Sequence, residues 1–348
     1  MNISIFGAGA WGTALAVHAA HKHSVTLWCR DANQAKALQS ERLNARYLPE
    51  VHLLDALDIT SDWRCAIDRL AGDSIAVIAT PFAGLSATLK ALNASVGTGA
   101  SDQLIVANLA KGLEPASFYL PHQVARRDAP KVAFVSLSGP SFAAEVARGL
   151  PVALVAASAD ERARQLTIAA FHHQAMRVYG SNDAIGVELA AALKNVIAIA
   201  AGACDGLALG SNARAALITR GLSEITSIGV ALGARADTFQ GLAGFGDLVL
   251  TCTGALSRNR QVGFLLAQHS ATKSDDTRSP QINGLEKITA SLGHVAEGVA
   301  CAAAAQSLAK RLGVDAPIID AVNQVLFEQL PAHQAVASLL ARAQKNEL

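Results

Sequence analysis

The amino-acid sequence predicts two domains: an α/β domain with a mostly parallel sheet over residues 1–180, and an all-α domain over residues 181–348. In the first half, short apolar runs alternate with helical patterns, which is typical of strands joined by crossover helices. Near residue 181 the strand patterns stop, and the rest of the chain shows helical periodicity. A chain of 348 residues is also long enough for about two domains.

Six apolar runs in the first half predict buried strands. They cover residues 2–6, 25–29, 74–81, 103–112, 132–141 and 151–158. Helical patterns follow the first and third runs, at 13–21 and 82–92. The second half predicts helices at 183–203, 211–232, 258–269, 286–292, 296–312, 316–329 and 332–345. Residues 270–284 are polar and rich in turn formers, so we expect a surface loop there.

The composition argues against several classes of protein. The net charge is +1, so no general field attracts nucleic acid or a membrane surface. The N-terminal residues MNISIFGAGAWG lack the basic region and long apolar core of a signal peptide. The most apolar long stretch, 184–203, contains Glu188 and Lys194, which disfavours a membrane span. We therefore expect a cytoplasmic protein that binds neither nucleic acid nor membrane.

Cysteine and histidine positions predict no metal site. The five cysteines are odd in number and contain no C-x-x-C pair, which argues against both a disulfide framework and a cysteine zinc site. A reducing compartment is the simplest interpretation. The histidine groups at 18–23 and 172–173 lack the carboxylates and the spacing of a metal centre, so we expect them on the solvated surface.

Residues 7–12, GAGAWG, fit the pattern G-x-G-x-x-G directly after the first predicted strand and at the start of a helix. In that context the pattern indicates dinucleotide binding. Gly7 permits the tight turn, Gly9 lets the backbone approach a pyrophosphate, and Gly12 lets the helix pack closely on the strand. The helix N-terminus adds free N–H groups and the positive end of a dipole. A plain turn between strand and helix is the alternative.

Arg30 and Asp31 directly follow the second predicted strand. An acidic residue at this place usually binds the ribose 2′-hydroxyl of NAD, whereas an arginine accommodates the 2′-phosphate of NADP. Because both are present, the preference between NADH and NADPH stays open. An exposed turn with no ligand is the remaining alternative.

Two further strand ends carry polar or glycine-rich segments. Lys111, in NLAKGLE, would lie at the carboxyl edge of the sheet, where open α/β sheets bind ligands. A surface lysine fits that position equally well. The segment 138–145, SGPSFAAE, contains Gly139 and Ser141 at a turn from strand to helix, and its helix N-terminus could hold an anion.

Lys194 lies in a nearly all-apolar helical stretch, where burying a cation is costly unless it has a partner or a task. Burial favours the neutral form of a lysine, so Lys194 could exchange a proton with a substrate hydroxyl. The alternative is a lysine whose ammonium reaches the surface. Asp247, in GFGD, could pair with this lysine, bind a substrate hydroxyl, or cap a loop.

A cationic cluster follows the segment TCTGAL: Ser257, Arg258, Asn259 and Arg260. Two guanidiniums flank an amide beside a hydroxyl, which raises the question of whether an anion binds there. Arginine suits phosphate because its planar fork can donate two parallel hydrogen bonds. Arg260 would point elsewhere on a helix, so we do not assign it to the site.

Six ordered blocks of this sequence resemble the bacterial-type NAD(P)-dependent glycerol-3-phosphate dehydrogenases: GAGAWGTALA, NLAKGLE, LSGPSFAAEVA, ALKNVIAIAAG, GLAGFGDLVLTCTGALSRNR and VAEG. The resemblance implies a Rossmann-type domain followed by a helical substrate domain. It implies hydride exchange between NADH or NADPH and dihydroxyacetone phosphate, giving sn-glycerol 3-phosphate for phospholipid synthesis. The chain departs from the usual pattern at Ala10, where many members have serine, and in the loop 270–284, which is longer than the family needs.

The same resemblance implies roles for individual residues. Lys194 would be the proton acceptor. Substrate contacts would come from Lys111, Gly139, Ser141, Lys194, Asp247, Ser257, Arg258 and Asn259. Cofactor contacts would come from Ala10, Trp11, Arg30, Lys111, Ala143, Arg258, Val295 and Glu297, in addition to the glycines Gly7, Gly9 and Gly12.

Two other functions stay open on the sequence. One is a related two-domain reductase of a hydroxy or keto acid, which would have to recognise a carboxylate. The other is a non-catalytic redox sensor that binds NAD(P)H and would not need a buried base such as Lys194. The size of the helical half leads us to expect a homodimer.

Overall fold

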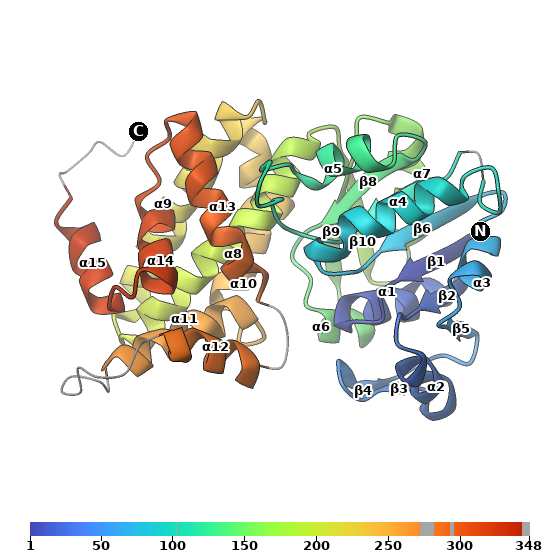
Figure 1. Ribbon diagram of the computed structural model, residues 1–348, viewed down its shortest axis with the longest axis horizontal. Coiled ribbons are helices and arrows are strands. Elements are labelled where there is room, and N and C mark those ends of the chain that lie inside the picture. Colours follow the sequence, from blue (N-terminus) through green and yellow to red (C-terminus); the bar gives the residue numbers. More distant parts are fainter. Residues whose placement is uncertain (102, 272–281, 293–295, 343–348) are drawn as a thin grey trace. The chain divides into compact units, whose positions relative to one another are not determined.

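The computed structural model describes residues 1–101, 103–271, 282–292 and 296–342 (Figure 1). The chain forms two compact units. Unit 1 comprises Met1–Glu114 and Tyr119–Glu188, and unit 2 comprises Pro115–Phe118 and Leu189–Leu348. The boundary predicted near residue 180 from the change in sequence pattern stays a prediction.

Unit 1 is built on an eight-stranded sheet of order β10-β9-β8-β7-β6-β1-β2-β5. The strands are β1 Asn2–Phe6, β2 Ser24–Trp28, β5 Leu57–Thr60, β6 Ser74–Ile78, β7 Ile105–Asn108, β8 Ala133–Ser138, β9 Val152–Ala157 and β10 Met176–Ser181. All neighbouring pairs are parallel except β8 and β9. The predicted mostly parallel sheet is therefore confirmed.

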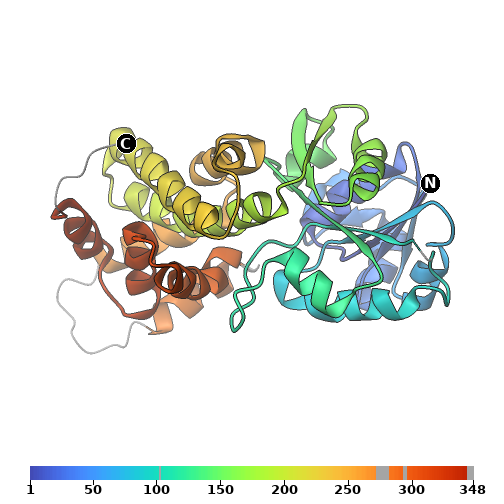
Figure 2. The same cartoon turned by 90° about the horizontal axis from the view of Figure 1, so that it is seen from above.

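Side-chain alternation along the strands explains why both faces of this sheet are covered. Ile3 and Ile5 belong to one buried cluster, whereas Phe6 belongs to the other. A strand buried on both faces needs apolar side chains at nearly every position, as the runs in this sequence have. Figures 1 and 2 show helices on both sides of the sheet. The helices of unit 1 are α1 Ala10–Ala20, α2 Ala32–Glu41, α3 Trp63–Asp68, α4 Leu85–Ser95, α5 Pro121–Asp128, α6 Ala143–Ala147 and α7 Glu161–Phe171.

The register places three strand ends at one edge. Phe6 of β1 pairs with Ile78 of β6, and Ile78 pairs with Asn108 of β7. Each of these residues is the last of its strand. The glycine turn and the segments after β6 and β7 therefore leave the sheet side by side at its carboxyl edge.

Sequence patterns missed the outer strands β5 and β10 and the separate antiparallel hairpin of β3 Leu43–Asn44 and β4 Leu48–His52. β10 alternates between buried and exposed positions over Met176–Tyr179, because it is an outermost strand. Such a strand lacks the continuous apolar run by which the inner strands were recognised.

The described secondary structure of unit 2 consists of helices joined by turns and loops. Its helices are α8 Ala184–Gly206, which begins within unit 1, α9 Gly210–Ala231, α10 Asp247–Thr253, α11 Arg258–Ala271, α12 Ile282–Ser291, α13 Glu297–Leu312, α14 Pro317–Phe327 and α15 Ala332–Leu340. The predicted all-α second half is thus confirmed, and α10 is a helix that the sequence patterns did not predict. Of the predicted loop 270–284, residues 272–281 lie outside the described residues. The prediction is wrong at both ends, because residues 270–271 belong to α11 and residues 282–284 to α12.

α8 is the one described helix that is long and apolar enough to cross a membrane by length and composition, and 83% of its most apolar window is buried. Close packing on α11 accounts for part of that burial. A Cβ at Gly202 would lie 1.8 Å from the carbonyl oxygen of Arg260, and one at Gly263 would lie 1.8 Å from the carbonyl oxygen of Ile199. The two backbones therefore touch at glycines. α8 is accordingly a core helix of the protein.

Candidate active site

The glycine turn of unit 1 has the geometry of a dinucleotide site. Gly7 has φ +125°, and a Cβ there would lie 2.7 Å from the carbonyl oxygen of Ala79. A Cβ at Gly12 would lie 2.0 Å from the carbonyl oxygen of Gly7. Gly9, in contrast, faces open space: apart from its two chain neighbours, no described residue would lie within 4 Å of a Cβ at this position. Two glycines thus permit tight packing, and the third leaves room for a ligand against the backbone.

The start of α1 can bind an anion. Gly9 is its N-cap and supplies no capping side chain, and the first turn holds no acidic residue. The first backbone N–H groups of the helix therefore remain available to a phosphate, at the positive end of the dipole. Ala10 and Trp11, which the family resemblance assigns to the cofactor, are the first two residues of this helix and are half-buried.

Arg30 and Asp31 have different environments at the end of β2. The Asp31 carboxylate accepts hydrogen bonds from the backbone N–H groups of Asn33, at 2.8 Å, and Gln34, at 3.4 Å, and so caps α2. Arg30 is exposed and has no acidic partner among the described residues. The charged group left for a ligand at this strand end is the guanidinium.

The turns after β7 and β8 place Lys111, Gly139 and Ser141 at the same edge of the sheet. Gly139 has φ +147°, and a Cβ there would lie 2.8 Å from the carbonyl oxygen of Ala153. Ser141 donates a hydrogen bond to the Gly139 carbonyl at 2.9 Å. Lys111 follows β7 and is half-buried, and Ala143 begins α6.

Two hydroxyls at this edge lack hydrogen-bond partners in the described part of the chain. They belong to Ser138, at the end of β8, and Thr80, just beyond β6, and both oxygens are buried. A buried polar atom without a partner is costly unless a ligand or water satisfies it. Sequence reasoning missed both residues. These oxygens and the space beside Gly9 fit a dinucleotide with many polar groups.

Glu188 is a buried carboxylate below the carboxyl edge of unit 1. It accepts hydrogen bonds from the backbone N–H of His122, from His122 Nδ1 at 2.6 Å and from the Ser136 hydroxyl. Burial alone would lower the pKa of His122, but the hydrogen bond and the charge of Glu188 raise it. Glu188 therefore fixes the start of α5 and one ring nitrogen of His122.

In unit 2, Lys194 is only 6% exposed and its ammonium has two specific partners. It donates a hydrogen bond to Asp247 Oδ1 at 2.5 Å and to Thr251 Oγ1 at 2.9 Å. Asp247 and Thr251 lie one turn apart on α10, and both are buried. The Thr251 hydroxyl in turn donates to the Asp247 carbonyl at 2.6 Å. Of the three roles considered for Asp247, the structure shows the pairing with Lys194, and the contact with Thr251 was not predicted.

The segment Ser257–Arg260 contains groups with different partners. Ser257 is buried, and its hydroxyl accepts a hydrogen bond from the backbone N–H of Arg260 at 3.3 Å. Asn259 donates to Asn195 Oδ1 at 3.0 Å and accepts from the Gly298 N–H at 3.0 Å. This bond to Asn195 uses one of the two amide hydrogens of Asn259. Arg260 pairs with Asp205 at 2.7 Å, so it points away from the site, as expected.

Arg258 is the exposed cation of this segment, and no acidic residue within the described ranges pairs with it. It is the first residue of α11, next to Ser257 and Asn259. Glu297 begins α13, immediately before Gly298. Val295 lies outside the described residues.

Comparison with known proteins identifies the family. Residues 2–164 match the family model for the N-terminus of NAD-dependent glycerol-3-phosphate dehydrogenase, and residues 183–337 match that for its C-terminus. The chain belongs to the NAD-dependent glycerol-3-phosphate dehydrogenase family.

Individual relatives agree over the full length. The chain is 51% identical to glycerol-3-phosphate dehydrogenase [NAD(P)+] of Methylibium petroleiphilum, over 100% of this chain and 98% of the relative. It is 49% identical to the protein of the same name from Herminiimonas arsenicoxydans, over 100% of both chains. The crystal structure of glycerol-3-phosphate dehydrogenase from Coxiella burnetii aligns with a TM-score of 0.87 at 36% identity, covering 98% of this chain and 99% of the other.

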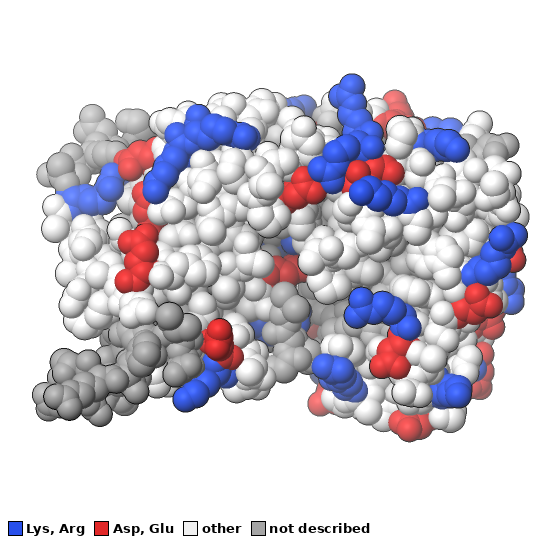
Figure 3. Space-filling model, in the orientation of Figure 1, with Lys and Arg blue, Asp and Glu red and all other residues white. Residues whose placement is uncertain are grey.

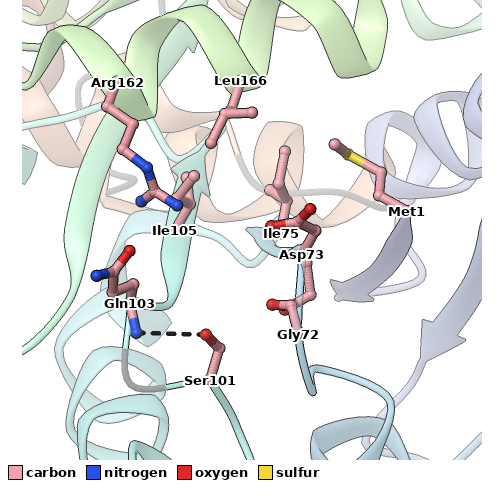
Figure 4. A pocket seen from close by; sticks show the side chains of 10 residues that line it. Met1, Gly72, Asp73, Ile75, Ser101, Gln103, Ile105, Arg162 and Leu166 are labelled. Atoms are coloured by element: carbon pink, nitrogen blue, oxygen red, sulfur yellow. Dashed lines mark hydrogen bonds between the residues drawn. The ribbon is translucent and has the colours of Figure 1, made fainter.

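A pocket of about 540 Å³ in unit 1 lies away from the residues assigned to this dehydrogenase site (Figure 4). Ser74 and Ile105, the first residues of β6 and β7, line it together with Arg162 of α7. The pocket is therefore at the amino edge of the sheet, opposite the glycine turn. We do not assign it to the dehydrogenase reaction.

Charged side chains of both signs lie on the face of the molecule that Figure 3 draws. On the face drawn in Figure 3, Lys and Arg side chains are interspersed with Asp and Glu, and no broad patch of one sign is visible.

Proposed function

We propose that this protein catalyses the reversible NAD(P)H-dependent reduction of dihydroxyacetone phosphate to sn-glycerol 3-phosphate. The observation that carries the proposal is the buried ammonium of Lys194, held by Asp247 and Thr251 in unit 2. Relatives about half identical over their whole length are named for this activity. A keto-acid reductase would need a site for a carboxylate, and a redox sensor would not need a buried lysine.

Unit 1 would bind the cofactor at the glycine turn. When bound, the nicotinamide cofactor supplies or accepts the hydride. The pyrophosphate would meet the N–H groups at the start of α1, and Arg30 would face the adenosine ribose, where its charge accommodates NADPH. The full proposed set is Gly7, Gly9, Ala10, Trp11, Gly12, Arg30, Lys111, Ala143, Arg258, Val295 and Glu297. Whether NADH or NADPH is preferred stays open.

Lys194 would transfer the proton of the reaction. In reduction, the ammonium donates a proton to the oxygen that develops negative charge at C2 of the substrate. In oxidation, the neutral amine accepts the proton of the C2 hydroxyl as the hydride leaves that carbon. Asp247 and Thr251 hold the nitrogen in place.

Arg258 would bind the phosphate group of the substrate. Its guanidinium is exposed and offers a planar pair of donors. Asn259 keeps one amide hydrogen for a ligand. The other proposed contacts are Lys111, Gly139, Ser141, Asp247 and Ser257, which supply donors or a close backbone approach.

Several broader features belong to the same proposal. Residues 1–180 would form the cofactor domain and residues 181–348 the substrate domain, a division that the two compact units support. We propose that the enzyme works in the cytoplasm as a homodimer. Its product would supply the backbone of glycerophospholipids.

The direct test is the absorbance of NADH or NADPH at 340 nm when dihydroxyacetone phosphate is added to the purified protein. We expect a substrate-dependent decrease with at least one cofactor. Replacing the substrate by a keto acid of similar size is the control for the rival reductase. If no substrate lowers the absorbance although NAD(P)H binds, the protein is a sensor and the proposal is wrong.

A further inference from the structure

Asn44 is a buried polar residue that has no role in the site described so far. It lies in β3, the first strand of the small hairpin, and is 2% exposed. Its Nδ2 donates to the carbonyl oxygen of Ala8 at 3.1 Å and to Thr13 Oγ1 at 2.7 Å. Ala8 belongs to the glycine turn and Thr13 to α1. One amide nitrogen therefore binds both the glycine turn and the helix that follows it.

The Ala8 carbonyl has a second donor. Gln34 of α2 donates Nε2 to the same oxygen at 3.0 Å. Two side chains from different elements therefore hold one carbonyl of the turn. Two donors restrict the direction of this carbonyl more than one donor would.

The direction of this carbonyl determines the direction of the next N–H. In a trans peptide the C=O of one residue and the N–H of the next point in opposite directions. With the Ala8 oxygen bound to Asn44 and Gln34, the N–H of Gly9 points the other way. Gly9 is the turn residue that faces open space within the described part of the chain.

We propose that Asn44, assisted by Gln34, is a positioning residue that aims the Ala8–Gly9 peptide so that its N–H meets the pyrophosphate of the bound dinucleotide. The inference rests on the proposed cofactor site at the glycine turn. It gives the β3–β4 hairpin a task in cofactor binding that no glycine of the motif performs.

The hairpin holds Asn44 firmly enough for this task. The Asn44 carbonyl accepts from the Tyr47 N–H at 3.1 Å, and Asn44 pairs with Leu48 across the hairpin. Leu48 and Leu53 are buried in the same apolar cluster as Leu15 of α1. The amide is therefore anchored in the core beside the helix whose first turn it braces.

The experiment measures cofactor affinity in Asn44→Ala, with Asn33→Ala as the matched control. Asn33 is exposed on α2, and its backbone N–H donates the hydrogen bond to Asp31, which the substitution keeps. Binding of NADH and NADPH is followed by fluorescence, and ADP-ribose, which keeps the pyrophosphate but lacks nicotinamide, is titrated as a competitor. Urea unfolding is measured on each variant without ligand.

We expect Asn44→Ala to weaken NAD(P)H and ADP-ribose by the same factor, about ten-fold for the loss of one or two neutral hydrogen bonds. The turnover number at saturating cofactor should stay within about two-fold, because Lys194 and its partners are untouched. Gln34→Ala should shift both affinities in the same direction by about three-fold, and it also provides the test if Asn44→Ala does not fold.

The idea is wrong if the folded variants lose stability but bind NAD(P)H and ADP-ribose as the wild type does. It is also wrong if NADH is weakened and ADP-ribose is not, since the defect would then lie at the nicotinamide. Failure of the wild type to reduce dihydroxyacetone phosphate would instead count against the proposed function. The cofactor affinities of the variants would still test the positioning role of Asn44.

Discussion

Arg258 and Arg260 lie two residues apart on α11, yet their side chains have different environments. Arg260 pairs with Asp205, which also pairs with Arg214 of α9 at 2.7 Å. Arg258 is exposed and without an acidic partner in the described ranges. A cation that is already paired stabilises the unit, whereas an unpaired one is available to a ligand.

Arg258→Ala should therefore weaken the use of dihydroxyacetone phosphate. A hydrogen bond to a charged group contributes about 1.5–3 kcal/mol, so kcat/KM should fall about ten- to a hundred-fold per bond lost. Steady-state kinetics on the phosphate ester and on unphosphorylated dihydroxyacetone measure this directly. The exposed Arg220 of α9, changed to Ala, is the control for loss of one positive charge.

The comparison between the two substrates decides the role of Arg258. If the variant loses as much activity with dihydroxyacetone as with its phosphate ester, the guanidinium does not bind the phosphate. A rise in the Michaelis constant of the cofactor alone would assign Arg258 to the cofactor only.

At the scale of single residues, sequence analysis could identify a candidate site residue when its side chain is unusual for the surrounding sequence. Lys194 was recognisable because it interrupts an apolar helix, and its pairing with Asp247 was one of the alternatives considered. Thr251 and Asn195 were not recognisable, since a threonine or an asparagine on a helix is common. Their roles depend on contacts with α8, α10 and α11 that only the fold creates.

At the scale of elements, the crossing of α8 and α11 brings Lys194 and the Ser257–Asn259 segment into one unit. Gly202 and Gly263 allow the two backbones to touch. Asn195, one residue after Lys194, is joined to Asn259 by the hydrogen bond at 3.0 Å. The distance between the proposed proton donor and the proposed phosphate ligands therefore depends on glycine packing.

Gly202→Ala tests this crossing. The added Cβ would lie 1.8 Å from a backbone oxygen, so the helices must separate. Overpacking of a core typically costs about 1–3 kcal/mol, which outweighs the gain of up to about 1 kcal/mol from alanine in a helix. Urea unfolding should show a lower free energy of unfolding. Gly241→Ala, where a Cβ would meet one atom at 3.4 Å, is the control.

An unchanged or higher unfolding free energy for Gly202→Ala would mean that the helices separate at no cost, and the packing argument would fail.

The local sequence also explains why helical patterns did not predict α10. That helix follows three glycines and a π-helical turn at Leu242–Gly246, so its seven residues carry no helical period of their own.

At the scale of the whole molecule, three of the five histidines that we expected on the surface, His18, His23 and His173, instead form a partly buried cluster in unit 1, whereas His21 and His172 are exposed as expected. The rings of His18 and His173 stack with centroids 4.0 Å apart, and His23 meets His173 edge-on. His18 and His23 bind backbone carbonyls, whereas the buried Nε2 of His173 has no partner among the described residues. Burial and the neighbouring histidines lower the pKa of His173 to about 4.

This cluster should make the fold sensitive to acid. A histidine whose pKa is lower in the folded state than the ordinary value of 6.5 binds its proton more readily when unfolded. Stability should therefore fall as the pH drops from about 6.5 towards 4. His173→Phe keeps a ring and removes the titrating group, so its unfolding free energy should fall less between pH 7 and pH 5 than that of the wild type.

Two controls separate this effect from other titrating groups. Burial raises the pKa of Glu224 to about 7, but Glu224 is present in both proteins and cancels in the comparison. The exposed His333 of α15, changed to Asn, should leave the pH dependence unchanged. Equal acid sensitivity of His173→Phe and the wild type would show that the cluster does not titrate on unfolding.

The general architecture was predictable from the sequence because it depends on periodicity. Continuous apolar runs marked the inner strands, and the helical half was recognisable by its lack of such runs. An outer strand such as β10 was missed because its side chains alternate between buried and exposed positions. The β3–β4 hairpin was missed because β3 has only two residues and carries no apolar run. Sequence patterns could not predict the hydrogen bond from Asn44 to the glycine turn, because the hairpin contacts the turn only in the folded unit.

The central claim is that Lys194 transfers the proton, and turnover of Lys194 variants tests it most directly. Lys194→Ala should lower turnover at least about a hundred-fold, while NAD(P)H still binds. Lys194→Arg keeps a positive charge opposite Asp247 but remains protonated, so it should fail nearly as badly with the fold intact. The exposed Lys310, changed to Ala, is the control. If folded Lys194→Ala retains more than about a tenth of wild-type turnover, Lys194 is structural and the account is wrong.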